Sequence, residues 1–246
     1  MTPGPDSERL LDQILAMWDR SAATDGAAPA PLPSEPAVAA AVGASRNSVR
    51  EAMIRLEERG YVHRSQGART VLNHRLKGLG RRVDQQVDHA QAIAAAGHTP
   101  SVEILSAGSV QVDDDEDRFD DLPAGSPAFR TAKLWRADGV PYVHAEDLIP
   151  VRDADRVADV DPQDPVFDLA EHLNGVAVAW ESVWFDPVLI TGDLAERFEV
   201  GAPQAGLQLT YCGFGPLDDV AYWSREVQLA PVGRLRSALV RRVRRG

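Results

Sequence analysis

The amino-acid sequence predicts an α+β protein in which two domains are joined by a short linker. Amphipathic helical periodicity dominates the first third of the chain, and alternating β-rich runs fill most of the remainder. Residues 1–83 contain 12 Lys and Arg against 9 Asp and Glu, whereas the rest contains 14 against 28, so the two parts also differ in charge. We therefore predict one domain at 1–73, a linker at 74–84 and a second domain at 85–246.

The composition is that of an ordinary globular protein, since 44% of the 246 residues are hydrophobic and 26% are charged. No basic segment followed by an apolar one marks a secretion signal, and no apolar stretch approaches the roughly 20 residues of a membrane span. These features predict a cytoplasmic protein without membrane contact. The single cysteine, Cys212, cannot form an intramolecular disulfide and is expected to pack in a core.

The strongest helical signal lies between Arg46 and Gly60, where apolar residues recur at the i, i+3, i+4, i+7 spacing of one helix face. Ser45 is a suitable N-cap and Gly60 a suitable C-terminal residue, so both ends are defined. Arg46 and Arg50 lie four residues apart and therefore share an exposed side in the first turns. The apolar positions are Val49, Ala52, Met53 and Leu56.

A shorter helix is predicted at 35–42, capped by Ser34 and carrying Pro36 in its first turn, where the missing N–H costs little. Residues 43–45 leave a three-residue turn between the two helices, which is the spacing of a helix-turn-helix. An apolar set within 10–18 predicts a first helix that packs behind both.

Two short strands joined by a tight turn at Gln66 and Gly67 are predicted after the second helix of this motif. Arg64 and Arg69 flank the turn, where they could meet phosphates or a narrow minor groove. The whole region thus has the pattern of a winged helix-turn-helix. Its residues 43–82 contain 10 cations against 3 anions in a chain of net charge −11, which suggests a polyanion partner for this part alone.

The stretch LPSEPAVAAAVGASRNSVREAMIRLEERGYVHRSQGARTVLN, residues 32–73, resembles the DNA-binding domain of GntR-type bacterial transcription regulators. A solvated helix surface would explain the arginines alone, but not their coincidence with the turn, the wing and the charge contrast. The resemblance implies that Arg46 and Arg50 read guanines or phosphates in the major groove. The family usually has an arginine where this chain has Pro36, and we expect an altered operator preference without loss of binding. The expected DNA contacts are Ser34, Ser45, Arg46, Asn47, Ser48, Arg50, Arg64, Gln66, Gly67 and Arg69.

Six β-rich runs follow, with helical stretches expected near 84–96, 113–121, 164–173, 192–199 and 234–245. Within them, DGVPYVHAE and DDVAYWSRE share Asp, Val, Tyr and Glu at a constant offset of 80 residues. Any two hairpins of alternating residues could look alike in this way. The alternative, which we favour, is a pseudo-twofold domain of two hairpin units around one sheet, with a cleft between them.

The order of LWRADGVPYVHAEDLIP, DLAERFEVGAP and a late YWS resembles the UTRA domain of the HutC branch of GntR regulators, over residues 84–246. The resemblance implies a mixed α+β, chorismate-lyase-like fold that dimerises and binds a small effector, commonly a phosphorylated sugar or another metabolite. Lys-Leu-Trp at 133–135 and Pro-Val-Phe at 165–167 stand where Arg-Leu-Arg and Ser-Leu-Tyr are usual. We therefore expect a less anionic, more apolar or aromatic effector, unless the aromatic residues only form core. The expected effector contacts are Lys133, Trp135, Arg136, His144, Glu146, Phe167, Trp180, Trp184, Tyr211 and Tyr222.

These patterns predict a DNA-binding transcription regulator, expected to be a repressor, that forms a homodimer on a pseudo-palindromic operator and responds to a small effector. Two alternatives remain: a plasmid or nucleoid protein that binds DNA without an effector, and a chorismate-lyase-like enzyme. The acidic run near 113–121 and the six histidines show no ligand-like spacing, so neither a metal nor a cofactor is expected. No catalytic residue is predicted, because no P-loop, dinucleotide glycine motif or nucleophile elbow appears.

Overall fold

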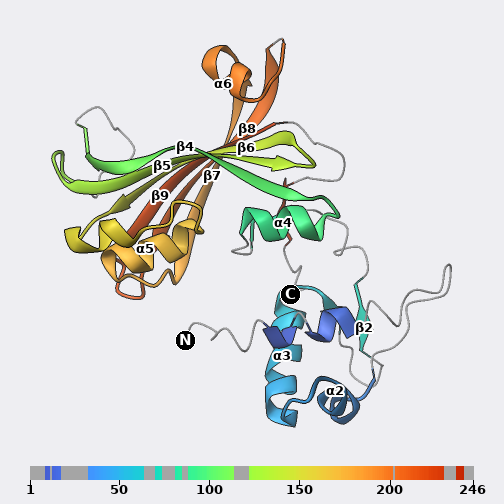
Figure 1. Ribbon diagram of the computed structural model, residues 1–246. Helices are drawn as coiled ribbons and strands as arrows, with labels where there is room; N and C mark the ends of the chain where they lie inside the picture. Colours follow the sequence, from blue (N-terminus) through green and yellow to red (C-terminus); the bar gives the residue numbers. More distant parts are fainter. Residues whose placement is uncertain are drawn as a thin grey trace, which may run out of the picture. The chain divides into compact units, whose positions relative to one another are not determined.

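The computed structural model divides the chain into two compact units, one formed by residues 1–86 with 236–246 and the other by residues 87–235. Figure 1 shows their helices and strands. Each unit has its own hydrophobic core. The structure describes residues 9–11, 13–17, 33–63, 70–73, 81–84, 88–113, 122–201, 203–229 and 237–240.

The helices of the first unit follow the predicted order. Residues 9–11 and 13–17 are helical, and they precede α2 (Glu35–Val42) and α3 (Arg46–Glu58). Gly43 ends α2 with φ +69°, a left-handed conformation that residues with a side chain rarely adopt, so the chain can turn into α3 within three residues. The predicted helix-turn-helix is confirmed.

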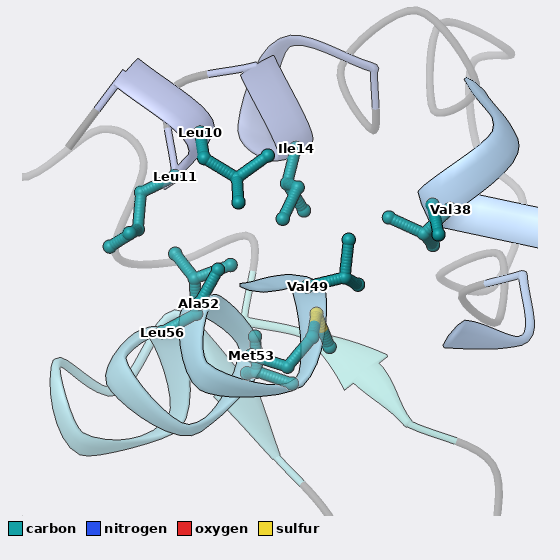
Figure 2. Close-up of a cluster of buried hydrophobic side chains, with 10 residues drawn as sticks. Leu10, Leu11, Ile14, Val38, Val49, Ala52, Met53 and Leu56 are labelled. Atoms are coloured by element: carbon teal, nitrogen blue, oxygen red, sulfur yellow. The ribbon is translucent and has the colours of Figure 1, made fainter. Parts of the chain in front are cut away.

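The apolar sides of these helices meet in one core (Figure 2). Leu11 and Ile14 come from the first helical segment, Val38 from α2, and Val49 and Leu56 from α3. Each of these five side chains is almost fully removed from water, which is worth about 1.5–3 kcal/mol for an aliphatic side chain. The apolar spacing of α3 thus orients the helix, because it directs the opposite, polar side to solvent.

Replacing Ser45 with alanine is expected to lower the free energy of unfolding of the first unit by about 0.5–2 kcal/mol. Ser45 Oγ accepts a hydrogen bond from the backbone N–H of Ser48 at 3.1 Å, and alanine would leave that donor uncapped. Ser34→Ala is the matched control, because Ser34 at the start of α2 makes no side-chain capping bond. Thermal unfolding compares the two variants, and equal losses of Tm would contradict the capping role.

Short strands complete the first unit. The predicted strands that flank the wing are present as β1 (Val62–His63) and β2 (Val71–Leu72), which pair antiparallel. Further along the chain, β3 (Arg81–Arg82) pairs in parallel with β10 (Ser237–Ala238). The predicted helix at 234–245 is therefore wrong at residues 237–238, where non-local pairing with β3 has replaced local helical propensity.

The second unit is built on a six-stranded antiparallel sheet with the order β4-β5-β6-β9-β8-β7. It consists of two three-stranded meanders that join where β6 pairs with β9, and it confirms the predicted α+β class. Cys212 on β8 is buried, as expected. The strands span Pro100–Gln111 (β4), Pro127–Ala137 (β5), Val140–Pro150 (β6), Trp180–Ile190 (β7), Gln204–Phe214 (β8) and Val220–Leu229 (β9).

The internal repeat in the sequence corresponds to the two central strands. Ala145 of β6 pairs with Glu226 of β9, and Glu146 pairs with Arg225, so residues 80 positions apart exchange places across the ladder. This register is that of a local twofold axis between the strands. Tyr142 and Tyr222, also 80 residues apart, are both fully buried. The favoured pseudo-twofold arrangement agrees with this sheet order, while the cleft between its halves stays a prediction.

Helices cover both faces of the sheet (Figure 1). Lys133 of β5 pairs with Ala145 of β6, which pairs with Glu226 of β9, so these three side chains point to the same face. We call it the α4/α5 face, because α4 and α5 pack on it, whereas α6 packs on the opposite face around Leu134 and Val227. The helices are α4 (His89–Ala95), α5 (Val166–Asn174) and α6 (Gly192–Arg197), with a short 3-10 helix, η2, at Ala154–Asp159.

Candidate DNA-binding surface and effector site

The exposed side of α3 carries side chains predicted to contact DNA. Arg46, Asn47, Ser48 and Arg50 are all exposed in its first turns. The N–H groups at a helix N-terminus favour anions, and two guanidinium groups one turn apart add to that positive field. Arginine can also engage guanine O6 and N7 bidentately. This end of α3 therefore suits the phosphates and base edges of a DNA groove.

Of the remaining predicted DNA contacts, the structure describes Ser34 and Ser45. Ser34 is exposed directly before α2. Ser45 is exposed too, but its hydroxyl already caps α3 and lies 2.9 Å from Ser48 Oγ. The wing contacts Arg64, Gln66, Gly67 and Arg69 lie outside the described residues and stay a prediction.

Four predicted effector contacts lie together on the α4/α5 face of the sheet. Lys133 and Trp135 lie two residues apart on β5 and so point to the same face. The strand pairing places Tyr222 of β9 and Tyr211 of β8 on that face as well. All four side chains are buried. Phe167, half-buried in the first turn of α5, belongs to a helix on the same side of the sheet.

A buried carboxylate organises the polar groups of this face. Asp147 of β6 accepts hydrogen bonds from Thr131 Oγ1 at 2.8 Å and from Ser224 Oγ at 2.7 Å. Its Oδ2 lies 3.6 Å from Lys133 Nζ, which also donates to the backbone oxygen of Asp164 at 2.8 Å. Both charged side chains are at most 5% exposed, so the lysine charge is compensated inside the protein.

A second polar pair lies on the same face as Lys133 and Asp147. His89 Nε2 of α4 is 2.8 Å from Glu226 Oε1 of β9, and the imidazole lies 5.4 Å from the Trp135 ring, centroid to centroid. Further along the same face, Tyr222 donates its hydroxyl hydrogen to Glu181. Burial and this neighbouring carboxylate raise the pKa of Tyr222 well above its ordinary value, so the phenol remains a neutral donor. The face thus combines aromatic surface with several carboxylates.

We call the polar side chains of this face the buried polar layer: Thr131, Lys133, Asp147, Ser224, Glu226 and Gln228, with His89 of α4. Most of them were not predicted as effector contacts from the sequence. Ser224, Glu226 and Gln228 are polar residues at alternate positions of a strand that is otherwise mostly apolar, and this spacing signals one shared face. Buried polar groups of this kind need partners and so mark a site. His89 carries no such signal, because Glu226 lies 137 residues further along the chain.

Other predicted effector contacts lie elsewhere. Arg136 is on the opposite face of β5 and donates to Glu199 at 2.7 Å and to Glu103 at 3.3 Å. His144 and Glu146 also point to the opposite face, because they alternate with Val143, Ala145 and Asp147 along β6. The edge strand β7 exposes 74% of Trp180 and 53% of Trp184. The structure therefore does not bring these five residues to the buried polar layer.

Lowering the pH from 7 to 5 is expected to destabilise the second unit through His144. Burial lowers the pKa of His144 below its ordinary 6.5; Glu146 opposes this shift and the Arg197 guanidinium adds to it. The unfolded chain then binds more protons than the folded one, so stability is full above about pH 6.5 and falls as the pH drops toward the folded-state pKa. Urea unfolding at both pH values measures the difference. His144→Gln should reduce it, and an unchanged difference in that variant would contradict this assignment.

The described residues contain no group of three or more His, Cys, Asp or Glu side chains placed to hold a metal ion. No helix among these residues is long and apolar enough to cross a membrane.

Family models match both units. Residues 25–72 match the bacterial regulatory proteins of the gntR family, and residues 95–227, more than half of the chain, match the UTRA domain. A helix-turn-helix unit followed by a UTRA unit defines a transcription regulator that binds DNA with the first and an effector with the second. The chain belongs to the GntR family, in its HutC subfamily with a UTRA effector domain. GntR regulators are not enzymes, and the lyase alternative is thereby set aside.

Solved structures show the same fold at low sequence identity. PhnF from Mycobacterium smegmatis is 19% identical, with a TM-score of 0.57 over 94% of this chain and 100% of that one. YydK from Bacillus subtilis, described as a possible transcriptional regulator, is 11% identical, with a TM-score of 0.71 over 98% of this chain and 100% of that one. A comparison with curated proteins found no match.

Proposed function

We propose that this regulator represses transcription as a homodimer on a pseudo-palindromic operator and that its effector changes its operator affinity. The observation that carries the proposal is the exposed pair Arg46 and Arg50 on α3, in a unit separate from the buried polar layer of the UTRA sheet. These arginines read base edges, while Ser48 contacts a phosphate. As an operator-binding protein, the regulator acts in the cytoplasm.

The effector is less anionic than a sugar phosphate and more apolar or aromatic. It binds on the α4/α5 face, where Lys133 is already paired with Asp147, and where Glu226 and Glu181 add further carboxylates. A phosphate dianion would therefore meet net negative charge, which is unfavourable at low dielectric. The Trp135 ring offers an aromatic surface for the ligand instead.

Footprinting of the region upstream of the protein's own gene tests the regulator proposal. We expect one protected site with twofold symmetry, and its protection should change when metabolites of neighbouring pathways are added. A coupling free energy of about 1–3 kcal/mol would change the affinity 5- to 150-fold. Protection that no metabolite alters would favour the effector-independent alternative.

Calorimetry with glucosamine 6-phosphate and glucose 6-phosphate tests the effector class. We expect no tight binding of either compound, because the site lacks the second cation that an Arg-Leu-Arg segment would supply at 133–135. Tight binding of a sugar phosphate would contradict the proposed class while leaving the regulator function in place.

A further inference from the structure

The two ends of the UTRA unit return to one place in the DNA-binding unit. β3 precedes the UTRA unit and β10 follows it, yet Arg81 pairs with Ser237 and Arg82 with Ala238. The ladder is extended by a hydrogen bond from the Val83 N–H to the Ala238 carbonyl at 2.9 Å. Both chain connections between the units therefore lead into the same two-stranded ladder.

Arg82 is the buried centre of this region. Its side chain is 4% exposed, and its Nε donates to Asp84 Oδ1 at 3.1 Å, while its Nη2 forms an ion pair with the same carboxylate. The guanidinium carbon lies 5.0 Å from the centre of the Tyr61 ring. Burial lowers the pKa of Arg82, but the interactions with Asp84 and Tyr61 together outweigh this effect and raise it, so the buried charge is stabilised.

The same guanidinium reaches the C-terminal end of α3. Arg82 Nη1 donates to the backbone oxygen of Arg59, the C-cap residue of α3, at 2.6 Å. The last carbonyls of a helix have no partner within the helix, and a cation there also interacts favourably with the helix dipole. Arg82 thus holds the C-terminal end of the helix whose other end carries Arg46 and Arg50.

The C-terminal segment completes the site of Arg82. Asp84 Oδ1 accepts from Arg82 Nε and also from the Val240 N–H at 3.4 Å, 156 residues further along the chain. The carboxylate that compensates the buried charge is therefore itself held by residues that follow the UTRA unit. A displacement of either connection between the units would act on Asp84 and, through Arg82, on the end of α3.

We propose that Arg82 is a positioning residue for DNA recognition and that residues 237–240 form a clamp that keeps it in place. The clamp links the C-terminus of the UTRA unit to the recognition helix through three side chains or segments: the β10 strand, the Asp84 carboxylate and the Arg82 guanidinium. Arg82 touches no base or phosphate in this role. It fixes the direction in which α3 presents its exposed arginines.

Two truncations test the clamp with a matched charge. A chain that ends at Val240 and a chain that ends at Arg236 both keep Arg236 and lack the arginines after residue 240, but only the longer one keeps the ladder with β3. In a gel shift with DNA from upstream of the gene, we expect the shorter chain to bind about tenfold more weakly than the longer one. Equal affinities of the two chains would overturn the proposal.

Arg82→Gln separates positioning from direct contact with DNA. We expect about a tenfold loss of affinity with an unchanged slope of log K against log salt, because a residue that contacts no phosphate releases no counterion. A slope reduced by about 1 would show a phosphate contact and overturn the positioning role. In the chain that ends at Arg236, Arg82→Gln should lower the DNA affinity little further, since both changes break the same contact chain.

Amide hydrogen exchange provides a readout that needs no DNA. In the chain that ends at Arg236 and in Arg82→Gln, the last turn of α3 should exchange about tenfold faster, whereas its first turn should change little. Unchanged exchange in the last turn would overturn the clamp even if the operator proposal holds. Faster exchange without DNA binding by any variant, wild type included, would instead count against the regulator proposal.

Discussion

Replacing Arg50 with alanine is expected to weaken operator binding at least tenfold, as the loss of one bidentate contact to guanine would, since such a contact is worth about 1–3 kcal/mol. Arg50 is exposed on α3 and is not part of the hydrophobic core, so the fold should be retained. Arg46, one turn earlier, shares its side of the helix, and the double variant should lose about a hundredfold if the two contacts are independent. Gel shifts at moderate salt measure both losses.

The control for Arg50→Ala removes the same charge elsewhere. Arg152 in the UTRA unit is exposed and forms a surface ion pair with Asp219 at 3.5 Å, which contributes little. Arg152→Ala should change the operator affinity less than twofold. Size-exclusion chromatography should show the same oligomeric state for both variants. An unchanged gel shift for Arg50→Ala would contradict its assignment as a base-reading residue.

Replacing Asp147 with alanine is expected to destabilise the UTRA unit by about 3–5 kcal/mol, because it leaves the buried Lys133 charge without its partner. The hydroxyl groups of Thr131 and Ser224 would lose their acceptor as well. Urea unfolding followed by tryptophan fluorescence measures the loss, since four of the five tryptophans of the chain lie within residues 87–235.

A double variant is the control for Asp147. In Lys133→Met with Asp147→Leu, neither charge remains, and the stability should return to within about 1–2 kcal/mol of the wild type because the buried ion pair has been replaced by apolar groups. A single Asp147→Ala variant as stable as the wild type would show that Lys133 finds another partner.

The DNA-binding unit could be predicted from the sequence because its signals are local. The apolar spacing of α3, its Ser45 cap and the glycine between the helices all act within a few residues. The six strands were also visible, since each carries its own β-rich pattern and turn residues. In both cases the short-range pattern and the final structure agree.

The set of residues that form the candidate effector site was harder to predict from the sequence. Trp135 and Arg136 are neighbours in the sequence and both are predicted effector contacts, but adjacent strand residues point to opposite faces of a sheet. Which face receives α4 and α5 depends on long connections that leave no local pattern. For the same reason, the contact of His89 with Glu226 and the pairing of β3 with β10 could not be predicted from their own segments.

The burial of Cys212 has a practical consequence for experiments on this regulator. It is the only thiol in the chain and is sealed within the sheet, so maleimide dyes should not react with the folded wild-type protein. Cysteines introduced at exposed positions such as Ala40 on α2 and Ser101 on β4 would then be the sole points of labelling. Energy transfer between two dyes at these positions would report directly whether a metabolite changes the separation of the two units.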